Sequence, residues 1–359
     1  MEEHLVIIRH TRLGEFIADV LGALGMPQHI LEPTVRLMVQ TDLRGVDSHG
    51  IGMLPRYVEW IQGGFIEPAA EPKIVRDEAA TALMDGQKAL GYYPSIVAMD
   101  LAIAKARTFG VGVVAVRNSN HFGAAANYSM MALAHDLIGL AATNSPYVAM
   151  VPTFGRQPRL STNPISLAAP AGAQTPFVLD MATTTVAIGK LLIAQRTRKP
   201  IPEGWAMDPT GRSTTDPAVA LAHRLLSPLG GSRALGGHKG YGLGVMVDIL
   251  SGVLSGAVHG DLFFRSTMPQ QKLHNVGHCF AAIDPARFRP IEEFKADMDD
   301  LLRSLKESPK AEGEDRIYTA GEPEVECERR RRVEGIPLPP ALVHQVNESA
   351  RALGLAPLA

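Results

Sequence analysis

The sequence predicts an α/β protein: a central sheet covered by helices, joined to a helical unit built from both chain ends. Three observations support this. The first ~70 residues show only helical hydrophobic spacing, residues 76–289 alternate strand and helix signals, and helical spacing returns after residue 290. A chain of 359 residues also suits about two domains. We therefore expect a helical domain formed by residues 1–75 with 290–359, and a central α/β domain of residues 76–289.

The first segment contains three predicted helices. Apolar residues recur at helical spacing in 11–26, which predicts the first helix. Pro33 stands where a first helical turn tolerates proline, so it is expected to open a second helix that Gly45 ends. A third helix is expected over about 54–63, after a loop that contains Ser48 and His49.

The middle of the chain predicts buried strands separated by helices. Residues 197–239, rich in Gly, Pro and Ser, lack a hydrophobic period and are expected to form a functional or mobile loop. Beyond them, helices are expected at 291–307 and from Pro340, with a Pro/Gly/Glu-rich segment between. The predicted strands are 80–86, 111–120, 137–144, 165–170, 176–182 and 277–285, and the predicted helices are 94–110, 124–136, 184–195 and 240–257.

Composition and charge exclude several classes of function. A net charge of −2 and a pI near 6.6 provide no electrostatic footprint for nucleic acid or an anionic membrane. The basic run Arg329 to Arg332 follows four glutamates and is expected to be a solvated, self-compensating face. Two cysteines, no secretory leader and no apolar run of about 18 residues predict a cytoplasmic globular protein without a membrane span.

The stretch "RNSNHFGAAANY" places His121 between a predicted strand and a predicted helix. Ligands of α/β proteins bind beyond strand ends, and helix N-termini offer unpaired N–H groups there. A histidine at such a place titrates near neutral pH and relays a proton. The alternative is that Asn120 caps the helix and His121 is incidental.

The stretch "TDLRGVDSHG" brings Arg44, Asp47, Ser48 and His49 close in sequence, with Tyr57 soon after. An arginine binds a carboxylate through two parallel hydrogen bonds, and a tyrosine hydroxyl adds a third. The alternative is a capped helix junction with surface charges. Because Asp47, Ser48 and His49 are adjacent, one side chain hardly serves the next, which argues against a hydrolase triad.

Two further stretches suit a nucleotide. "FVLDMATTT" ends a buried strand on Asp180 just before a helix, where free N–H groups suit a phosphate or ribose; alternatively Asp180 only caps the helix. "LGGHKGYGLG" surrounds Lys239 with glycines; alternatively this is a flexible turn with a solvated lysine.

Two other motifs are rejected. The stretch "GVGVVA" at 110–115 runs from helix to strand, which is the reverse of the order in a dinucleotide-binding fingerprint. His274 and His278 are not aligned by a helix, and we expect no metal site.

Taken together, six segments resemble the malate/L-lactate dehydrogenase family of the second, non-Rossmann type, which includes ureidoglycolate and sulfolactate dehydrogenases and cyclic imino acid reductases. The resemblance runs in order from about residue 10 to 340. It implies a non-Rossmann mixed sheet, a homodimer, NAD or NADP as cofactor, and hydride transfer at C2 of a small 2-hydroxy or 2-oxo acid. The segments are "TDLRGVDSHG", "RNSNHFGAAA", "STNPISLAAP", "VLDMATTTVAIGK", "IPEGWAMDPTGRSTTDP" and "GGHKGYGLGVMVDILSGVLSGA".

The resemblance also implies roles for matching residues. His121 corresponds to the proton acceptor, His49 and Ser48 line the substrate pocket, and Asp180 supports the acid–base relay. Arg44 and Tyr57 fall on the same wall of the pocket. The stretches expected to contact the cofactor are Ser145, Asp180-Met181-Ala182, Lys239 and Gly321-Glu322-Pro323.

One position departs from the family pattern. Members often have an arginine three residues after "SHG", expected to hold the substrate carboxylate, and this chain has Met53 there. Either Arg44 or Arg56 substitutes, or the substrate presents another group. The departure leaves the reaction class in place and the substrate undetermined. The alternatives are a cyclic imino acid reductase and a catalytically silent ligand-binding member.

Overall fold

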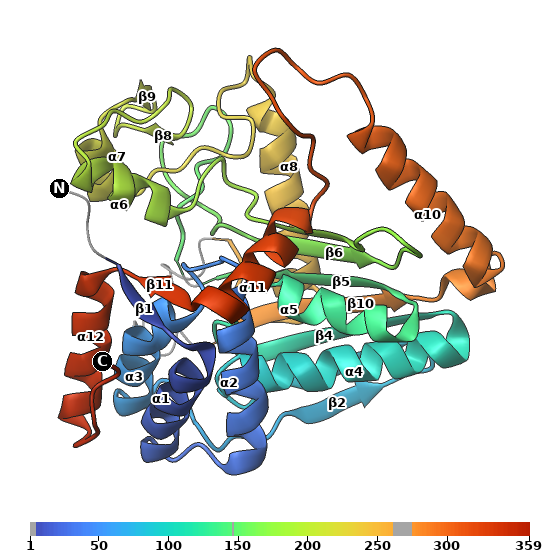
Figure 1. Cartoon of the computed structure of the whole chain (residues 1–359), viewed down its shortest axis with the longest axis horizontal. Coiled ribbons are helices and arrows are strands. Elements are labelled where there is room, and N and C mark those ends of the chain that lie inside the picture. The colour runs from blue at the N-terminus through green and yellow to red at the C-terminus, as the bar shows by residue number, and fades with distance from the viewer. Residues whose placement is uncertain (1–4, 146, 261–274) are drawn as a thin grey trace.

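A mixed sheet of seven strands forms the centre of the molecule, in the order β2-β3-β4-β10-β5-β6-β7. The computed structural model describes residues 5–145, 147–260 and 275–359 (Figure 1). Neighbouring strands run antiparallel except β3 and β4, which are parallel. This confirms the predicted α/β class with a mixed central sheet. The strands are β2 (Lys73–Asp77), β3 (Thr81–Asp85), β4 (Val111–Ser119), β5 (Ile138–Thr143), β6 (Ile165–Ala169), β7 (Phe177–Met181) and β10 (Val276–Ile283).

Helices cover both faces of the sheet (Figure 1). On one face lie α4 (Tyr92–Phe109), the short α5 (Ala126–Ser129) and the 3-10 helix η2 (Met130–His135). On the other lie α8 (Gly237–Asp248) and the π-helical turn η3 (Ile249–Val253) that continues it. The strands are therefore buried between two layers, as their apolar sequences require.

The two chain ends lie side by side (Figure 1). Strand β1 (Val6–Ile8) pairs antiparallel with β11 (Ile336–Leu338). Around this pair gather α1 (His10–Ala23), α2 (Gln28–Leu43), α3 (Leu54–Gln62), α11 (Glu322–Glu334) and α12 (Pro340–Ala352).

Helix α10 (Ile291–Lys306) lies apart from the other terminal helices, beside the turn between β6 and β7. Its Asp299 carboxylate accepts hydrogen bonds from the backbone N–H groups of that turn, residues 172–174. One hydrophobic cluster also runs without a break from α1 through α4 to β4. The division into two domains therefore stays a prediction.

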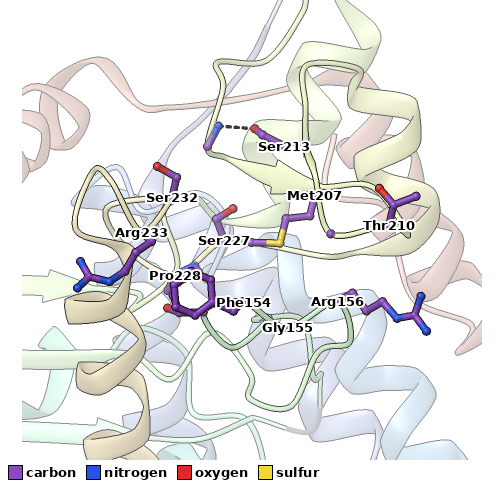
Figure 2. Close-up of a pocket in the computed structure, with 14 residues that line it drawn as sticks. Phe154, Gly155, Arg156, Met207, Thr210, Ser213, Ser227, Pro228, Ser232 and Arg233 are labelled. Atoms are coloured by element: carbon purple, nitrogen blue, oxygen red, sulfur yellow. Dashed lines mark hydrogen bonds between the residues drawn. The ribbon is translucent and has the colours of Figure 1, made fainter.

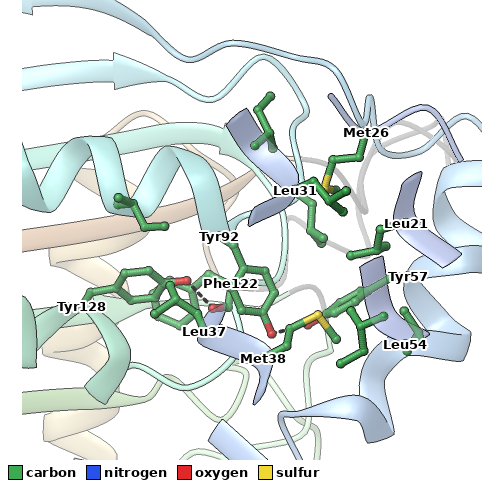
Figure 3. Packing of buried hydrophobic residues seen from close by; sticks show 14 of the residues in the cluster. Leu21, Met26, Leu31, Leu37, Met38, Leu54, Tyr57, Tyr92, Phe122 and Tyr128 are labelled. Atoms are coloured by element: carbon green, nitrogen blue, oxygen red, sulfur yellow. Dashed lines mark hydrogen bonds between the residues drawn. The ribbon is translucent and has the colours of Figure 1, made fainter. Parts of the chain in front are cut away.

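A fully buried aromatic cluster joins the terminal helices to the sheet (Figure 3). It contains Tyr57 of α3, Tyr92 of α4, and Phe122 and Tyr128 on either side of the start of α5. The Tyr128 hydroxyl donates to the carbonyl oxygen of Phe122 at 2.5 Å. Each buried aromatic removes about 150–250 Å² from water, so this cluster fixes α3, α4 and the chain after β4 relative to one another.

Two helix predictions differ from the structure. Helix α2 begins at Gln28, so Pro33 lies inside the helix and not in its first turn. The buried Ile30, Leu31, Leu37 and Met38 hold that helix against the core, which offsets the hydrogen bond that the proline removes. The predicted helix at 124–136 is only a four-residue α-helix followed by the 3-10 helix η2.

Two other predictions for the chain ends were incomplete. The first ~70 residues are not all helical, since β1 precedes α1. The Pro/Gly/Glu-rich segment after residue 307 contains α11, which opens with Pro323 beside acidic residues and closes with basic ones, as the helix dipole favours. Arg331 of that helix is buried, so the run Arg329 to Arg332 is not a wholly solvated face.

Residues 188–223 carry small ordered elements around a separate hydrophobic cluster: α6 (Ile188–Arg196), β8 (Ala206–Met207), β9 (Ser213–Thr214) and α7 (Pro217–His223). None of the helices in the described residues is long and apolar enough to cross a membrane.

Candidate active site

His121 lies in the loop between the end of β4 and α5. The Tyr57 hydroxyl lies 2.7 Å from its Nδ1 atom. The backbone N–H of Gly91, which caps α4, donates to the His121 carbonyl at 3.1 Å. Gly123 follows at a φ of +76°, and a side chain there would strike the Tyr92 ring. These contacts fix both the backbone and the ring of His121.

His49 stands in the turn between α2 and α3 and faces His121. The two imidazoles stack with centroids 5.5 Å apart and planes 24° apart. Ser48 Oγ lies 2.7 Å from His49 Nδ1, and the Tyr92 hydroxyl donates to the His49 carbonyl at 3.3 Å. The structure thus brings Ser48, His49 and Tyr57, which are close in sequence, together with the distant His121.

Both histidines are kept neutral by their surroundings. Desolvation, followed by the nearby His49, His278 and Arg56, lowers the pKa of His121 to about 3. Desolvation also lowers the pKa of His49. A neutral imidazole has one nitrogen with a free lone pair, so His121 is ready to accept a proton at neutral pH. In the described residues, its Nε2 makes no hydrogen bond to protein, which leaves that atom for a ligand.

The turn that carries His49 is held in place by contacts with Asp42 of α2 and Arg331 of α11. Asp42 of α2 is fully buried, and its Oδ2 accepts from the Ile51 backbone N–H at 2.7 Å. Arg331 of α11 donates to the Asp42 carbonyl at 2.5 Å and forms an ion pair with Asp47. Arg331, which is 284 positions from Asp47 in the chain, therefore holds the turn, and the sequence alone did not indicate this contact.

We expect an Asp42→Asn protein to lose less stability than wild type between about pH 5 and pH 8. Burial raises the pKa of the Asp42 carboxyl to about 8, so the folded chain keeps a proton that the unfolded chain releases near pH 4. The protonated Asp42 carboxyl therefore makes its full contribution to the free energy of unfolding below pH 4. This contribution falls by up to about 1.4 kcal/mol per pH unit and is lost as the pH rises through about 8. Chemical denaturation at several pH values tests this. An exposed control, Asp19→Asn, should follow wild type, and an Asp42→Asn curve parallel to wild type would contradict the assignment.

Arg44 and Tyr57, both predicted to lie on one wall of the substrate pocket, have different surroundings in the structure. Tyr57 touches His121 directly. Arg44 is only 7% exposed and pairs with Glu328 of α11 at 3.6 Å. Its guanidinium is therefore committed to a protein carboxylate, and it affects Asp180 only through its charge.

Asp180 lies at the end of β7, and its Oδ2 accepts from the Ala126 N–H of α5 at 2.8 Å. Desolvation by the surrounding protein raises its pKa to about 6, although the residue is exposed to solvent. In the described residues, the Asp180 carboxylate makes no hydrogen bond to His49 or His121. The hydrogen-bond partner of the His121 ring is the Tyr57 hydroxyl.

The predicted stretches Asp180–Ala182 and Gly321–Pro323 lie side by side. The Val178 N–H donates to the Ala320 carbonyl at 3.0 Å, which joins β7 to the start of α11. The Glu322 carboxylate is already occupied by Lys306 at 2.8 Å and by the Thr319 N–H. One carboxylate oxygen of Glu324, close by, is buried without a partner.

Ser145 follows β5 and stands on the histidine side of the site. Its Oγ accepts from the Tyr147 N–H at 3.3 Å, and the Tyr147 hydroxyl accepts from Arg56 Nη1 at 2.6 Å. Tyr147 has no sequence signal that marks it, since it is a lone aromatic in a loop. Arg56 was noted only as a possible substitute for the missing arginine.

Lys239 lies in the first turn of α8, exposed, and in the described part of the chain it has no hydrogen bond or ion pair of its side chain. A nearby hollow of about 420 Å³ is walled by residues 153–156, 204–213 and 227–233, with Arg156 and Arg233 on opposite sides (Figure 2). The hydroxyl of Thr153, one of its lining residues, is buried and has no hydrogen-bond partner among the residues that the structure describes. The Leu229 N–H donates to the Thr183 carbonyl at 2.9 Å, which ties this hollow to the chain just after β7.

These features fit a ligand that carries phosphates. Guanidinium and ammonium groups bind phosphate oxygens, and an unpartnered hydroxyl supplies a further hydrogen bond. No group of three or more His, Cys, Asp or Glu residues able to hold a metal occurs in the described ranges. His278 is buried between Thr143 and Ser119, and His274 lies outside the described residues.

The chain is similar to known proteins along nearly its whole length. Residues 8–347 match the family model described as malate/L-lactate dehydrogenase. The chain is 42% identical to a malate dehydrogenase of Pyrococcus abyssi, over 99% of this chain and 97% of that one. It is 41% identical to an L-sulfolactate dehydrogenase of Methanocaldococcus jannaschii, over 98% of both. The crystal structure of a malate dehydrogenase from Entamoeba histolytica superposes with a TM-score of 0.93 at 34% identity, over 98% of this chain and 99% of that one.

Proposed function

Because this chain belongs to the malate/L-lactate dehydrogenase family, and is therefore an oxidoreductase of 2-hydroxy acids, we propose the following reaction. The protein transfers hydride between NAD or NADP and C2 of a small 2-hydroxy or 2-oxo carboxylate. The observation that carries the proposal is the neutral His121, whose Nδ1 lies 2.7 Å from the Tyr57 hydroxyl while its Nε2 is left for a ligand.

In oxidation, His121 Nε2 accepts the proton of the C2 hydroxyl as the C2–H bond breaks and the carbonyl forms. The nicotinamide, when bound, accepts the hydride. For Nε2 to accept this proton, the neutral ring carries its own proton on Nδ1. The Tyr57 hydroxyl oxygen then accepts a hydrogen bond from Nδ1–H in both the neutral and the protonated ring, so this contact is kept throughout. In reduction, the same proton returns from Nε2 to the oxygen on C2.

Ser48, His49 and Asp180 support this step in different ways. Ser48 fixes the ring of His49, and His49 forms the floor of the substrate pocket by stacking on His121. Asp180 holds the start of α5, five residues beyond His121, and so positions the loop that carries the base. We assign Asp180 a positioning role and leave the proton transfer to His121.

The cofactor is proposed to run along one side of the sheet. Ser145 lies near the histidines, Asp180, Met181 and Ala182 lie at the end of β7, and Gly321, Glu322 and Pro323 lie beside them. Lys239 and the two arginines of the hollow in Figure 2 provide the positive charge for the phosphates. A hollow flanked by Arg156 and Arg233 suits a dinucleotide, and it does not by itself separate NAD from NADP.

The wider setting is likewise a proposal. We propose a homodimer of two-domain chains, acting in the cytoplasm on a small-molecule acid, with no nucleic acid or membrane partner. The cysteine content and the near-neutral charge support this setting.

Purified protein mixed with NADH or NADPH and a panel of substrates tests the proposed reaction. The panel contains pyruvate, oxaloacetate, sulfopyruvate and a cyclic 2-carboxylate imine, and the readout is loss of reduced-nicotinamide absorbance. We expect consumption of a reduced cofactor with at least one 2-oxo acid. Consumption with the imine alone would make the protein a cyclic imino acid reductase. Binding without consumption would favour a catalytically silent member, and hydrolysis without nicotinamide would favour a hydrolase.

A further inference from the structure

Met53 and Arg56 occupy neighbouring places on one helical surface. Met53 ends the 3-10 turn Ile51–Met53, and Arg56 stands in the first turn of α3. Residues three positions apart in a helix lie on the same face, about 4.5 Å apart along the axis. A positive charge at residue 56 therefore stands about one turn beyond the place where the family pattern puts it.

The guanidinium of Arg56 is held in place without being neutralised. Its Nη1 donates to the Tyr147 hydroxyl at 2.6 Å, and its central carbon lies 5.3 Å from the Tyr147 ring centroid. The Tyr147 ring in turn stacks on Trp60 at 6.1 Å. Among the described residues no carboxylate pairs with Arg56, so most of its five N–H donors remain for an anion.

Arg56 is exposed to solvent on α3, the helix that also carries the buried Tyr57. Its neighbour Tyr57 contacts His121, and Tyr147 is joined to Ser145. The charge of Arg56 acts on His121 as well. The other candidate, Arg44, is buried and committed to Glu328.

We propose that Arg56, presented by Tyr147, binds a carboxylate of the substrate in place of the arginine that Met53 replaces. This rests on the proposed function and adds a specificity-determining residue to it. The guanidinium offers two parallel N–H groups to a carboxylate, which a lysine cannot reproduce in the same geometry. Tyr147 acts as a positioning residue, because it orients the guanidinium and leaves the substrate to Arg56.

Steady-state kinetics of Arg56→Gln with the best 2-oxo acid of the panel tests this. We expect KM for the oxo acid to rise about 10- to 100-fold, as loss of a bidentate charge-assisted contact implies, while KM for the cofactor stays within twofold. Arg56→Lys should recover part of the loss, and Tyr147→Phe should raise KM less than Arg56→Gln. Arg76→Gln, an exposed arginine on β2, is the matched control and should leave both constants unchanged.

The rescue variant gives a second, independent readout. Adding Met53→Arg to Arg56→Gln returns a guanidinium to the same helix face, and we expect KM for the oxo acid to recover at least tenfold. The affinity for oxamate, an unreactive analogue measured by calorimetry, should fall and recover in parallel.

An Arg56→Gln protein whose KM for the oxo acid stays within twofold of wild type would overturn the role of Arg56 while the dehydrogenase activity stands. Wild-type protein that oxidises no reduced cofactor with any 2-oxo acid would instead overturn the proposed function. The two failures are therefore distinguishable.

Discussion

A His121→Ala protein is expected to bind its nicotinamide cofactor normally and to turn over about 10²- to 10⁴-fold more slowly than wild type. His121 has an imidazole nitrogen left for a ligand, the Tyr57 hydroxyl on its other nitrogen and a neutral charge state at working pH. Without it, the proton on the C2 oxygen has no acceptor within hydrogen-bond reach. Cofactor affinity is measured by fluorescence titration and kcat by steady-state kinetics.

The matched control is His223→Ala, an exposed histidine at the end of α7, which should keep both constants. A His121→Ala protein with kcat within about threefold of wild type would remove His121 from the chemistry. Loss of cofactor affinity together with kcat would instead point to a collapsed site, which the melting temperature of the variant distinguishes.

The second large effect is expected from Gly91→Ala, at a residue with no functional group. Gly91 has a φ of −60° and a ψ of −12°, which alanine adopts freely, so the backbone itself tolerates the change. A methyl group there would, however, overlap the carbonyl oxygen of Asn120 and come within 2.8 Å of that of His121. The segment that carries the catalytic base must move.

We expect kcat of Gly91→Ala to fall about 10- to 100-fold and the melting temperature to fall with it, because a displacement near 1 Å at a reacting group costs that much. Gly189→Ala in α6 is the control, since an added Cβ meets nothing within 4 Å there. Unchanged kcat and melting temperature in Gly91→Ala would mean that the contact between α4 and the His121 loop does not position the base.

Local signals in the sequence predicted much of this molecule. The strands of the sheet other than β2 follow from hydrophobic periodicity, as does the helix α4, which Gly110 ends as expected for a left-handed residue. Strand β2 was not predicted, because all five of its residues are exposed and it has no buried apolar face. The stretches around Ser48–His49 and His121 were recognised because polar residues between buried elements are costly unless they serve a purpose. These segments do meet in the structure.

What could not be predicted depends on contacts between distant parts of the chain. Arg331 looked like one member of a solvated charge run, yet it lies under the His49 turn because β1 and β11 bring the two chain ends together. Tyr147 carries no periodic or motif signal, and only the fold shows that it contacts Arg56. Arg44 is predicted to bind the substrate, and the sequence does not indicate its ion pair with Glu328 of α11.

The central claim is that hydride moves between the nicotinamide and C2 of a 2-oxo acid while His121 handles the proton. Reduction of the best 2-oxo acid with NADH or NADPH deuterated at nicotinamide C4, on the transferred face, tests it most directly. Mass spectrometry and proton NMR of the product should show one deuterium, located at C2, and a product made by the His121→Ala protein should form far more slowly with the same label. A product without deuterium at C2, or no reduced product from any acid of the panel, would contradict the account.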